Sequence, residues 1–221
     1  MANVKFARDE VILLLDVAYS SVQERMYGVT SAEVVELSAV LQKLPIHPVE
    51  KRPENFRNFA GIQTQLYNFV KGCSNDTEHP KVGELFFQIS AEFPDRQELH
   101  NVAMAIKRNI PYYSSTFGDI SESVGFPEGV LLGHLHRLLE QRDSLRLTLD
   151  DRCCICQLKP DLLYQPCSSL LQHHLTVSPI EMDGGKKYEA NDFITVCPNC
   201  HAALHRVRPW LTKRNCGELL R

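Results

Sequence analysis

The sequence predicts an α+β protein in which a mostly helical N-terminal part is followed by a small strand–turn–strand–helix unit. Apolar residues recur at helical spacing through most of residues 1–150. The composition changes after residue 150, where seven of the eight cysteines lie and where the β-branched and aromatic segment 193–196 predicts a strand. We therefore expect a helical domain over residues 1–115, a bridging helix or linker over residues 116–150 and a second domain over residues 151–221.

The composition is that of an ordinary globular chain, and it excludes several classes of protein. The 221 residues are 43% hydrophobic and 23% charged, which allows a buried core without disulfide staples and argues against disordered or collagen-like classes. No apolar run approaches the roughly 20 residues that cross a bilayer. The first eight residues have no long apolar core before a cleavage site, so we expect no secretion and a cytoplasmic location. In such a compartment, clustered cysteines more often bind metal than form disulfides.

The charge is distributed unevenly between the two halves. The net charge of −3 combines 15 Lys and Arg against 20 Asp and Glu in residues 1–150 (−5) with 9 against 7 in residues 151–221 (+2). Any nucleic-acid contact made by the acidic N-terminal half must therefore be a local patch.

Helical periodicity and capping residues locate the expected helices. The predicted ranges are residues 8–26, 30–44, 58–70, 82–93, 95–108 and 127–139. Thr30 and Glu33 form a capping box at the start of the second range, and Asp95 is the expected N-cap of the fifth. His134 and His136 lie two apart in the last range, so we expect them to face different ways and not to bind metal.

The C-terminal part alternates between strand and helix signals. We expect a short strand within residues 170–179, a turn at Gly184-Gly185, a second strand at residues 193–196 and a short helix over residues 202–210. A unit this small buries little apolar area by itself, so it needs a further stabilising link.

Two Cys-x-x-Cys pairs can supply that link. They are Cys153 with Cys156 and Cys197 with Cys200. Each pair places two sulfurs on one metal, and four thiolates suit tetrahedral zinc, so we predict a structural Zn²⁺ site. Cys154 is a register alternative to Cys153, although only one residue separates it from Cys156.

Four histidines surround the cysteine pairs: His173, His174, His201 and His205. His201 and His205 are four residues apart, so on a helix they share one face and reach one metal. The adjacent His173 and His174 point to opposite faces of a strand, so one could bind that metal while the other acts as a base. One metal ion beside one neutral imidazole is enough to hydrolyse a phosphodiester.

These motifs resemble a known family. Cys153-x-x-Cys156, then Gln172-His173-His174, then the run Asn-Asp-Phe-Ile-Thr-Val-Cys-Pro-Asn-Cys-His-Ala-Ala-Leu-His at residues 191–205 resemble the HNH, or ββα-metal, nucleases. The likeness is greatest to McrA-like restriction endonucleases with a four-cysteine zinc site. Weaker motifs around Arg8, Arg57 and Glu128 resemble the helical N-terminal half of bacterial members.

The resemblance implies a role for each matching residue. His173 takes the position of a metal ligand, His174 that of the general base, and His201 and His205 those of further ligands of the catalytic metal. Asp192 stands where the family has an Asn that orients the loop carrying the base or ligates the metal. A carboxylate there favours Mg²⁺ or Mn²⁺, with Ni²⁺ and Co²⁺ as alternatives, or it signals reduced activity.

The resemblance also implies a function and partners. We expect a bacterial restriction or defence endonuclease that hydrolyses phosphodiester bonds in duplex DNA and reads modified DNA such as 5-methylcytosine. The alternatives are a sequence-specific Type II restriction enzyme and a catalytically weak, zinc-dependent DNA-binding module. Symmetric cuts in duplex DNA need two active sites, so we expect a homodimer.

Polar and basic side chains in two regions are candidates for DNA contacts. In the N-terminal half they surround a predicted loop and helix start: Arg52, Arg57 and Asn58. In the tail they follow the histidines: Arg206, Arg208, Lys213 and Arg214. The tail residues are expected to contact phosphates, and the alternative is a solvated surface.

Overall fold

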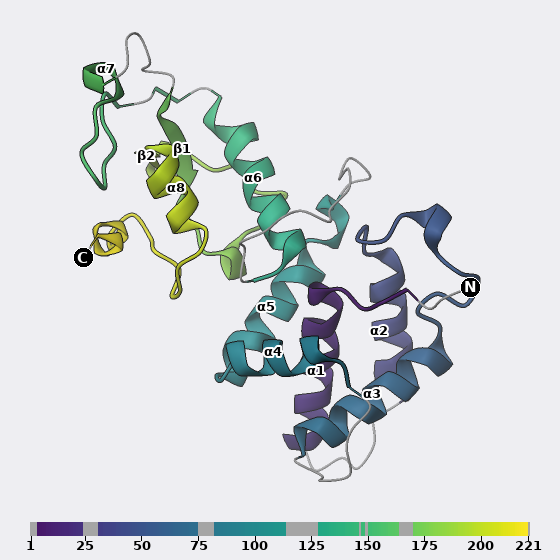
Figure 1. Cartoon of the computed structure of the whole chain (residues 1–221). Helices are drawn as coiled ribbons and strands as arrows, with labels where there is room; N and C mark the ends of the chain where they lie inside the picture. The colour runs from purple at the N-terminus through teal and green to yellow at the C-terminus, as the bar shows by residue number, and fades with distance from the viewer. Residues whose placement is uncertain are drawn as a thin grey trace. The chain divides into compact units, whose positions relative to one another are not determined.

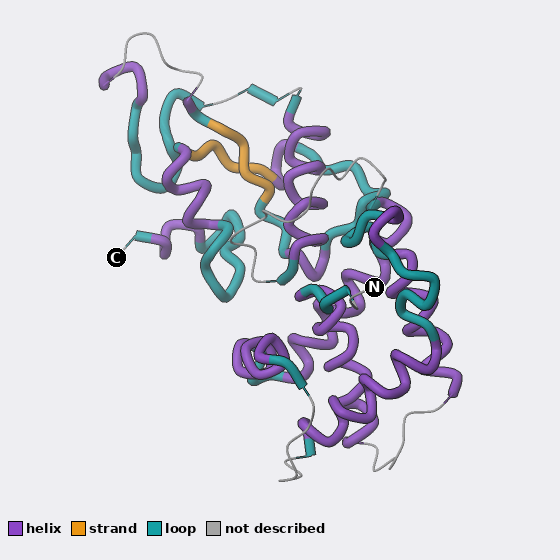
Figure 2. Tube along the Cα trace, turned by 45° about the vertical axis from the view of Figure 1, so that its right-hand side comes forward, coloured by secondary structure: helices purple, strands orange, loops and turns teal. Residues whose placement is uncertain are grey.

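The computed structural model divides the chain into two compact units, Met1–Ile120 and Ser121–Arg221. It describes residues 4–23, 31–74, 82–113, 128–145, 147–148, 150–163 and 170–220. Helices dominate, and the strands within these ranges form a single two-stranded sheet (Figures 1 and 2), which confirms the predicted α+β class. No helix in the described ranges is both long and apolar enough to cross a bilayer.

The first unit is built around its first helix, α1 (Arg8–Gln23). Helix α1 packs against α2 (Ser31–Lys43), α3 (Phe59–Cys73), α4 (Glu84–Glu92) and α5 (Arg96–Arg108). The apolar run at residues 11–15 of α1 is buried on every side, as expected for a helix surrounded by others.

The helix starts in this unit follow the capping residues of the sequence. The side chain of Asp95 accepts a hydrogen bond from the N–H of Gln97 (2.8 Å), which confirms the predicted N-cap of α5. Asn58 caps α3 in the same way, accepting from the N–H of Gly61 (2.9 Å). The predicted end of the first helix at Met26 and the predicted capping residue Thr30 lie outside the described residues.

The second unit contains the longer helix α6 (Val130–Ser144), which packs against the sheet, and a small strand–strand–helix arrangement. Strand β1 (Gln172–Leu175) pairs antiparallel with β2 (Phe193–Val196), with His174 opposite Ile194, and α8 (Pro198–Leu204) follows directly. The other elements within the described part of this unit are α7 (Pro160–Leu163) and the short 3-10 helices Pro179–Glu181, Ala190–Asp192 and Cys216–Leu219. Figure 1 shows β1, β2 and α8 side by side, with α6 along β1.

Helix α8 begins earlier and ends earlier than residues 202–210, the range that the sequence predicted. Cys197 is its N-cap and Pro198 its first residue, a position where proline loses no hydrogen bond and presets the helical φ angle. The helix ends at Leu204, with His205 as its C-cap. The predicted second strand is confirmed at residues 193–196, and the first is confined to Gln172–Leu175.

The cysteines belong to the core of the second unit rather than to its surface. The buried cluster that contains them consists of Cys153, Ile155, Leu171, Ile194, Val196, Cys197, Cys200, Leu204, Leu211 and Cys216. Backbone hydrogen bonds tie the first cysteine pair to β2, since the N–H of Cys154 donates to the carbonyl of Thr195 (2.9 Å). The fold thereby brings both Cys-x-x-Cys pairs to one end of the sheet.

Candidate metal centres

The structure brings the four cysteines of the two pairs together. The sulfur atoms of Cys153, Cys156, Cys197 and Cys200 all lie within 4.8 Å of one another. The Sγ atoms of Cys156 and Cys197 are 3.7 Å apart. Two thiolates bound to a tetrahedral zinc at about 2.3 Å each would lie about 3.8 Å apart. The cluster therefore has the donors and the spacing to hold a zinc ion, as predicted.

Local backbone structure explains how the first pair forms its half of this site. Gln157 has a positive φ of 61°, and its N–H donates to the carbonyl of Cys153 (2.9 Å), which closes a tight turn around Cys156. Cys154, the register alternative, is exposed and lies outside the cluster. Cys153 is therefore the member of the pair that the fold directs inward.

The surroundings of Cys153 favour its thiolate form. Burial raises the pKa of this thiol, but backbone N–H groups of Cys156, Cys197 and Ile155 more than offset burial and lower the pKa to about 7. Metal binding requires the thiolate, so these N–H groups prepare the sulfur for a metal.

A second cluster lies in the same unit and contains three of the four predicted histidines. His174 on β1, His201 on α8 and His205 at the end of α8 meet a carboxylate that the sequence analysis did not single out, Glu140 on α6. Their candidate ligand atoms lie within 4.8 Å of one another. The Nε2 atoms of His201 and His205 are 3.0 Å apart, and Glu140 Oε1 lies 3.1 Å from Nδ1 of His174.

A hydrogen bond orients the ring of His201 toward the centre of the cluster. Its Nδ1 lies 2.6 Å from Oε1 of Gln172, an oxygen that can only accept, so Nδ1 carries the hydrogen. Nε2 then presents its lone pair to the Nε2 of His205 and to Glu140 Oε1, 3.3 Å away. An imidazole lone pair directed at a second imidazole nitrogen and at a carboxylate oxygen is typical of a ligand set that converges on a cation.

Burial favours the neutral form of two histidines of this cluster, His174 and His205. It lowers the pKa of His174 to about 4 and that of His205 to about 2. Burial raises the pKa of Glu140, but its interactions with His136, His174 and His201 hold it well below the usual value. Neutral imidazoles and an ionised carboxylate are the protonation states that bind a divalent metal.

A buried nitrogen atom of the cluster that lacks a hydrogen-bond partner indicates that the cluster fits a metal ion. His174 is fully buried, and within the described ranges its Nε2 has no hydrogen-bond partner. A buried imidazole nitrogen without a partner costs free energy unless a ligand occupies it. The indole of Trp210 stacks on the same ring, with centroids 5.6 Å apart, and separates it from solvent.

Access to the cluster comes from an open depression of about 550 Å³. Its lining includes His201, His205 and Glu140, and His173 also borders it. A second depression of about 450 Å³ is lined by His173 and Lys213. The exposed side of the cluster is thus reachable by a molecule much larger than water.

The structure places the two adjacent histidines apart, as expected for neighbours on a strand. The one that lies in the cluster is not the one that the resemblance implied as a metal ligand. His174, the expected base, lies in the cluster, whereas His173, the expected ligand, lies outside it and is half-buried. Nε2 of His173 lies 3.4 Å from the carbonyl of Leu147, which can only accept, so its Nδ1 is the basic nitrogen.

Asp192 lies outside the cluster and closes a turn. Its Oδ2 accepts from the N–H of Glu189 (2.9 Å), and its carbonyl accepts from both the N–H and the hydroxyl of Thr176 (2.8 Å each). Thr176 directly follows β1, so Asp192 ties the end of the strand that carries His173 and His174 to the start of β2. This placement favours the loop-orienting role over the metal-ligand role.

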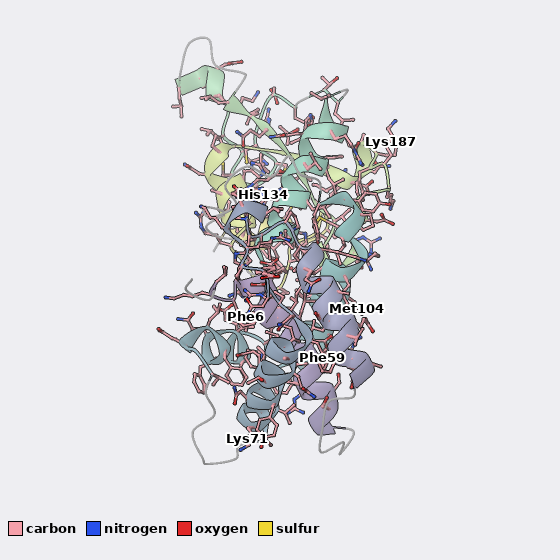
Figure 3. All side chains as sticks on the ribbon, turned by 90° about the vertical axis from the view of Figure 1, so that its right-hand side faces the viewer. Phe6, Phe59, Lys71, Met104, His134 and Lys187 are labelled. Atoms are coloured by element: carbon pink, nitrogen blue, oxygen red, sulfur yellow. The ribbon has the colours of Figure 1, made fainter. Side chains whose placement is uncertain are left out.

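The three N-terminal candidates for DNA contact have structural partners. Arg57 is buried, and its guanidinium binds Glu10 and the carbonyls of Val4 and Lys5. Its ring neighbours include Phe6, labelled in Figure 3, at 3.7 Å from the guanidinium carbon to the ring centroid. Arg52 donates to the backbone carbonyls of residues 42, 44 and 47, and Asn58 is the N-cap of α3. The geometry therefore does not support a DNA contact by Arg57.

The tail candidates are more accessible. Lys213 and Arg214 are exposed, and Lys213 borders the second depression. Arg206 is exposed and donates to the carbonyl of Ala202, while Arg208 forms an ion pair with Glu128 (3.4 Å). Lys213 and Arg214 remain the candidates best placed to meet an external anion.

One member of the histidine cluster and one of its neighbours were missed because they lie on α6, far from the cysteine motifs in the sequence. Glu140 is a member of the cluster, and His136 lies beside it, with ring centroids of His136 and His174 5.2 Å apart. The sequence analysis predicted that His134 and His136 face different ways, but it did not predict that His136 lies against this cluster. The signal that could have found them is the i,i+4 spacing of His136 and Glu140, which places both on one helix face.

Comparisons with known protein families, with curated proteins and with solved structures found no match. The fold and the two clusters themselves define the class: an α+β protein whose second unit carries a four-cysteine cluster and a histidine–carboxylate cluster.

Proposed function

We propose that this chain is a metal-dependent endonuclease that hydrolyses phosphodiester bonds in duplex DNA. The observation that carries the proposal is the convergence of His174, His201 and His205 beside an open depression, with a further imidazole, His173, bordering the same depression. A histidine-held divalent metal next to a basic imidazole is a minimal set for phosphodiester hydrolysis. The four cysteines hold a structural zinc in this proposal.

The proposal assigns each histidine a task from its position. His174, His201 and His205 hold the metal, whose contribution is to stabilise negative charge on the scissile phosphate. His173 accepts the proton of the attacking water through Nδ1 while the Leu147 carbonyl holds its Nε2–H. The water oxygen forms a bond to phosphorus, and the bond to the leaving sugar oxygen breaks. This assignment exchanges the roles of His173 and His174 that the resemblance implied.

The biological setting of the proposal comes from the resemblance to HNH nucleases. It is a restriction or defence enzyme that reads modified DNA, such as 5-methylcytosine, through the helical first unit. Cutting both strands calls for two active sites, so the working form in this proposal is a homodimer on its DNA. Lys213 and Arg214 would contact phosphates there, and their replacement would weaken binding regardless of sequence.

A pair of variants tests the proposal and the two roles together. We expect His174→Ala to lose both the second bound metal and DNA cleavage, whereas His173→Ala keeps the metal and loses cleavage. His100→Ala, which changes a histidine of the first unit, is the matched control and is expected to cleave like the wild type. The measurements are metal content of the zinc-loaded protein and nicking of a plasmid in Mn²⁺. Cleavage by His173→Ala and His174→Ala at the wild-type rate would contradict the proposal.

A further inference from the structure

We propose that Glu140, on α6, is a fourth ligand of the metal held by the histidine cluster, and that His136 is the positioning residue that holds it there. The inference rests on the metal site of the proposed function. It extends that site to a helix that precedes the strand–strand–helix arrangement in the sequence.

The first support is the place of the carboxylate within the cluster. Oε1 of Glu140 lies 3.1 Å from Nδ1 of His174 and 3.3 Å from Nε2 of His201. Oxygen and nitrogen ligands of one metal ion, each at about 2.1 Å from it, lie about 3 Å apart, so these separations are those of neighbouring ligands. A small movement of these side chains would let one cation contact the oxygen and both rings.

The second support is charge. Glu140 is 6% exposed, and among the described residues its ion-pair partners are His136, His174 and His201. An ionised carboxylate taken out of water needs a compensating positive charge. A divalent cation in the cluster would supply it.

The third support is a pair of hydrogen bonds that join α6 to the strand bearing His174. Glu140 Oε1 accepts from the N–H of Leu175 (2.9 Å), and His136 Nε2 donates to the carbonyl of the same residue (2.8 Å). One helical turn of α6 therefore holds both backbone groups of the residue after His174. Nδ1 of His136 lies 3.4 Å from Glu140 Oε1, so the same ring also contacts the carboxylate.

A fourth protein ligand affects which metal can serve the proposed reaction. Three imidazoles and one carboxylate would satisfy an ion that takes four ligands, as zinc does in closed sites, and leave it no position for substrate. An ion that takes six ligands would keep positions for substrate. The inference therefore favours Mn²⁺, Co²⁺ or Ni²⁺ over Zn²⁺ in the histidine cluster.

The test measures metal binding rather than activity. Full-length protein is loaded with zinc at the cysteines, and Ni²⁺ is titrated calorimetrically into the wild type, Glu140→Gln, His136→Gln and His136→Ala. The matched control is Glu181→Gln, which removes an exposed carboxylate of the same unit. Retention of the cysteine-bound zinc reports that each variant is folded.

We expect Glu140→Gln to weaken Ni²⁺ binding by about 100-fold or more and His136→Ala by about 10- to 100-fold, while Glu181→Gln binds like the wild type. His136→Gln can still donate to the Leu175 carbonyl, so it should retain more affinity than His136→Ala. This rescue by the conservative variant distinguishes positioning from general packing.

Two results would overturn the inference while leaving the proposed function intact. The first is wild-type Ni²⁺ affinity in a folded Glu140→Gln protein. The second, which needs no variant, is a crystal structure of the nickel-loaded wild type in which the anomalous peak contacts the imidazoles and Glu140 is turned away. A wild-type protein that binds no Ni²⁺ beyond its zinc would instead overturn the metal site of the proposed function itself.

Discussion

Glu10 and Arg57 of the first unit are buried against each other in a bidentate ion pair. Nε of Arg57 donates to Oε1 of Glu10 (2.6 Å) and Nη2 donates to Oε2 (2.8 Å), while His47 lies 2.9 Å from the same Oε2. Arg57 adopts a positive φ of 49°, a conformation that few residues with a side chain adopt. The surrounding contacts must therefore stabilise this position, which makes the pair part of the architecture of the unit.

Glu10→Gln is expected to destabilise the protein strongly. The substitution leaves the buried Arg57 guanidinium without its counter-charge, which costs about 3–5 kcal/mol of unfolding free energy. Glu92→Gln, which removes a partly exposed carboxylate paired with Arg8, is the control and should cost at most about 1 kcal/mol. Urea unfolding followed by far-ultraviolet circular dichroism measures both, and equal midpoints for the two variants would contradict this account.

The same pair gives the first unit a defined response to acid. Burial raises the pKa of Glu10, but its hydrogen bonds to His47 and Arg57 bring it below the usual value of 4.5. Below pH 4.5 the unfolded chain therefore binds a proton that the folded one does not, so the stability of the wild type falls as pH falls through this range. We expect Glu10→Gln to lose that part of the pH dependence.

The choice between two adjacent cysteines is also a residue-scale claim. The fold directs Cys153 into the four-cysteine cluster and leaves Cys154 exposed. We expect Cys153→Ser to lose bound zinc and to unfold the second unit, because this small unit depends on its metal clip. Cys154→Ser should keep one zinc and a wild-type melting temperature. Zinc content and the fluorescence of Trp210, the sole tryptophan, report the two effects.

The polar side chains before and at the start of α3, which the sequence offered as candidates for DNA contact, have partners within the chain. Arg52 and Asn58 bind backbone groups at helix ends, and Arg57 binds Glu10. Residue types indicate hydrogen-bonding capacity, whereas only the fold shows how much of it the chain itself uses. The clustering of the cysteine pairs was easier to predict because the spacing of two Cys-x-x-Cys motifs is itself typical of a shared metal site.

At the scale of elements, the short 3-10 helix Ala190–Asp192 connects the histidine strand to β2. The Glu189 side chain and Asp192 form a reciprocal capping box at this turn. We expect Asp192→Ala to cost about 0.5–2 kcal/mol of stability in the second unit, since an N–H loses its acceptor. Asp192→Asn keeps an acceptor oxygen, so it should melt close to the wild type and cleave DNA. A larger loss in Asp192→Asn than in Asp192→Ala would contradict the loop-orienting role.

Helix α6 marks the limit of prediction at this scale. Helical periodicity predicted α6, and the residue types of the following segment predicted β1. Nothing in the sequence indicates that His136 and Glu140 of the helix contact Leu175 of the strand. That pairing arises because α6 packs along β1, a contact between segments separated by more than thirty residues. Helical spacing predicted that His201 and His205 share a face, and the strand period predicted that His173 and His174 do not.

At the scale of the whole molecule, the two units divide the chemistry unevenly. Both clusters of candidate ligands within the described ranges lie in the second unit, whereas the first holds the buried Glu10–Arg57 pair among its helices. Composition predicted this division, since cysteines and histidines concentrate after residue 150. In the proposed function, the second unit cuts DNA and the first selects the site.

The most direct test of the central claim is a cleavage assay on plasmids that are unmodified, 5-methylcytosine-containing, hydroxymethylated or phosphorothioated. The full-length protein, with zinc at its cysteines, is assayed in Mg²⁺, Mn²⁺, Co²⁺ or Ni²⁺, with EDTA and His174→Ala as controls. The account predicts metal-dependent discrete fragments from one of these substrates and no cleavage in either control. Binding to DNA without cleavage in any metal, by protein that carries its zinc and is folded, would contradict the nuclease assignment and favour a DNA-binding module.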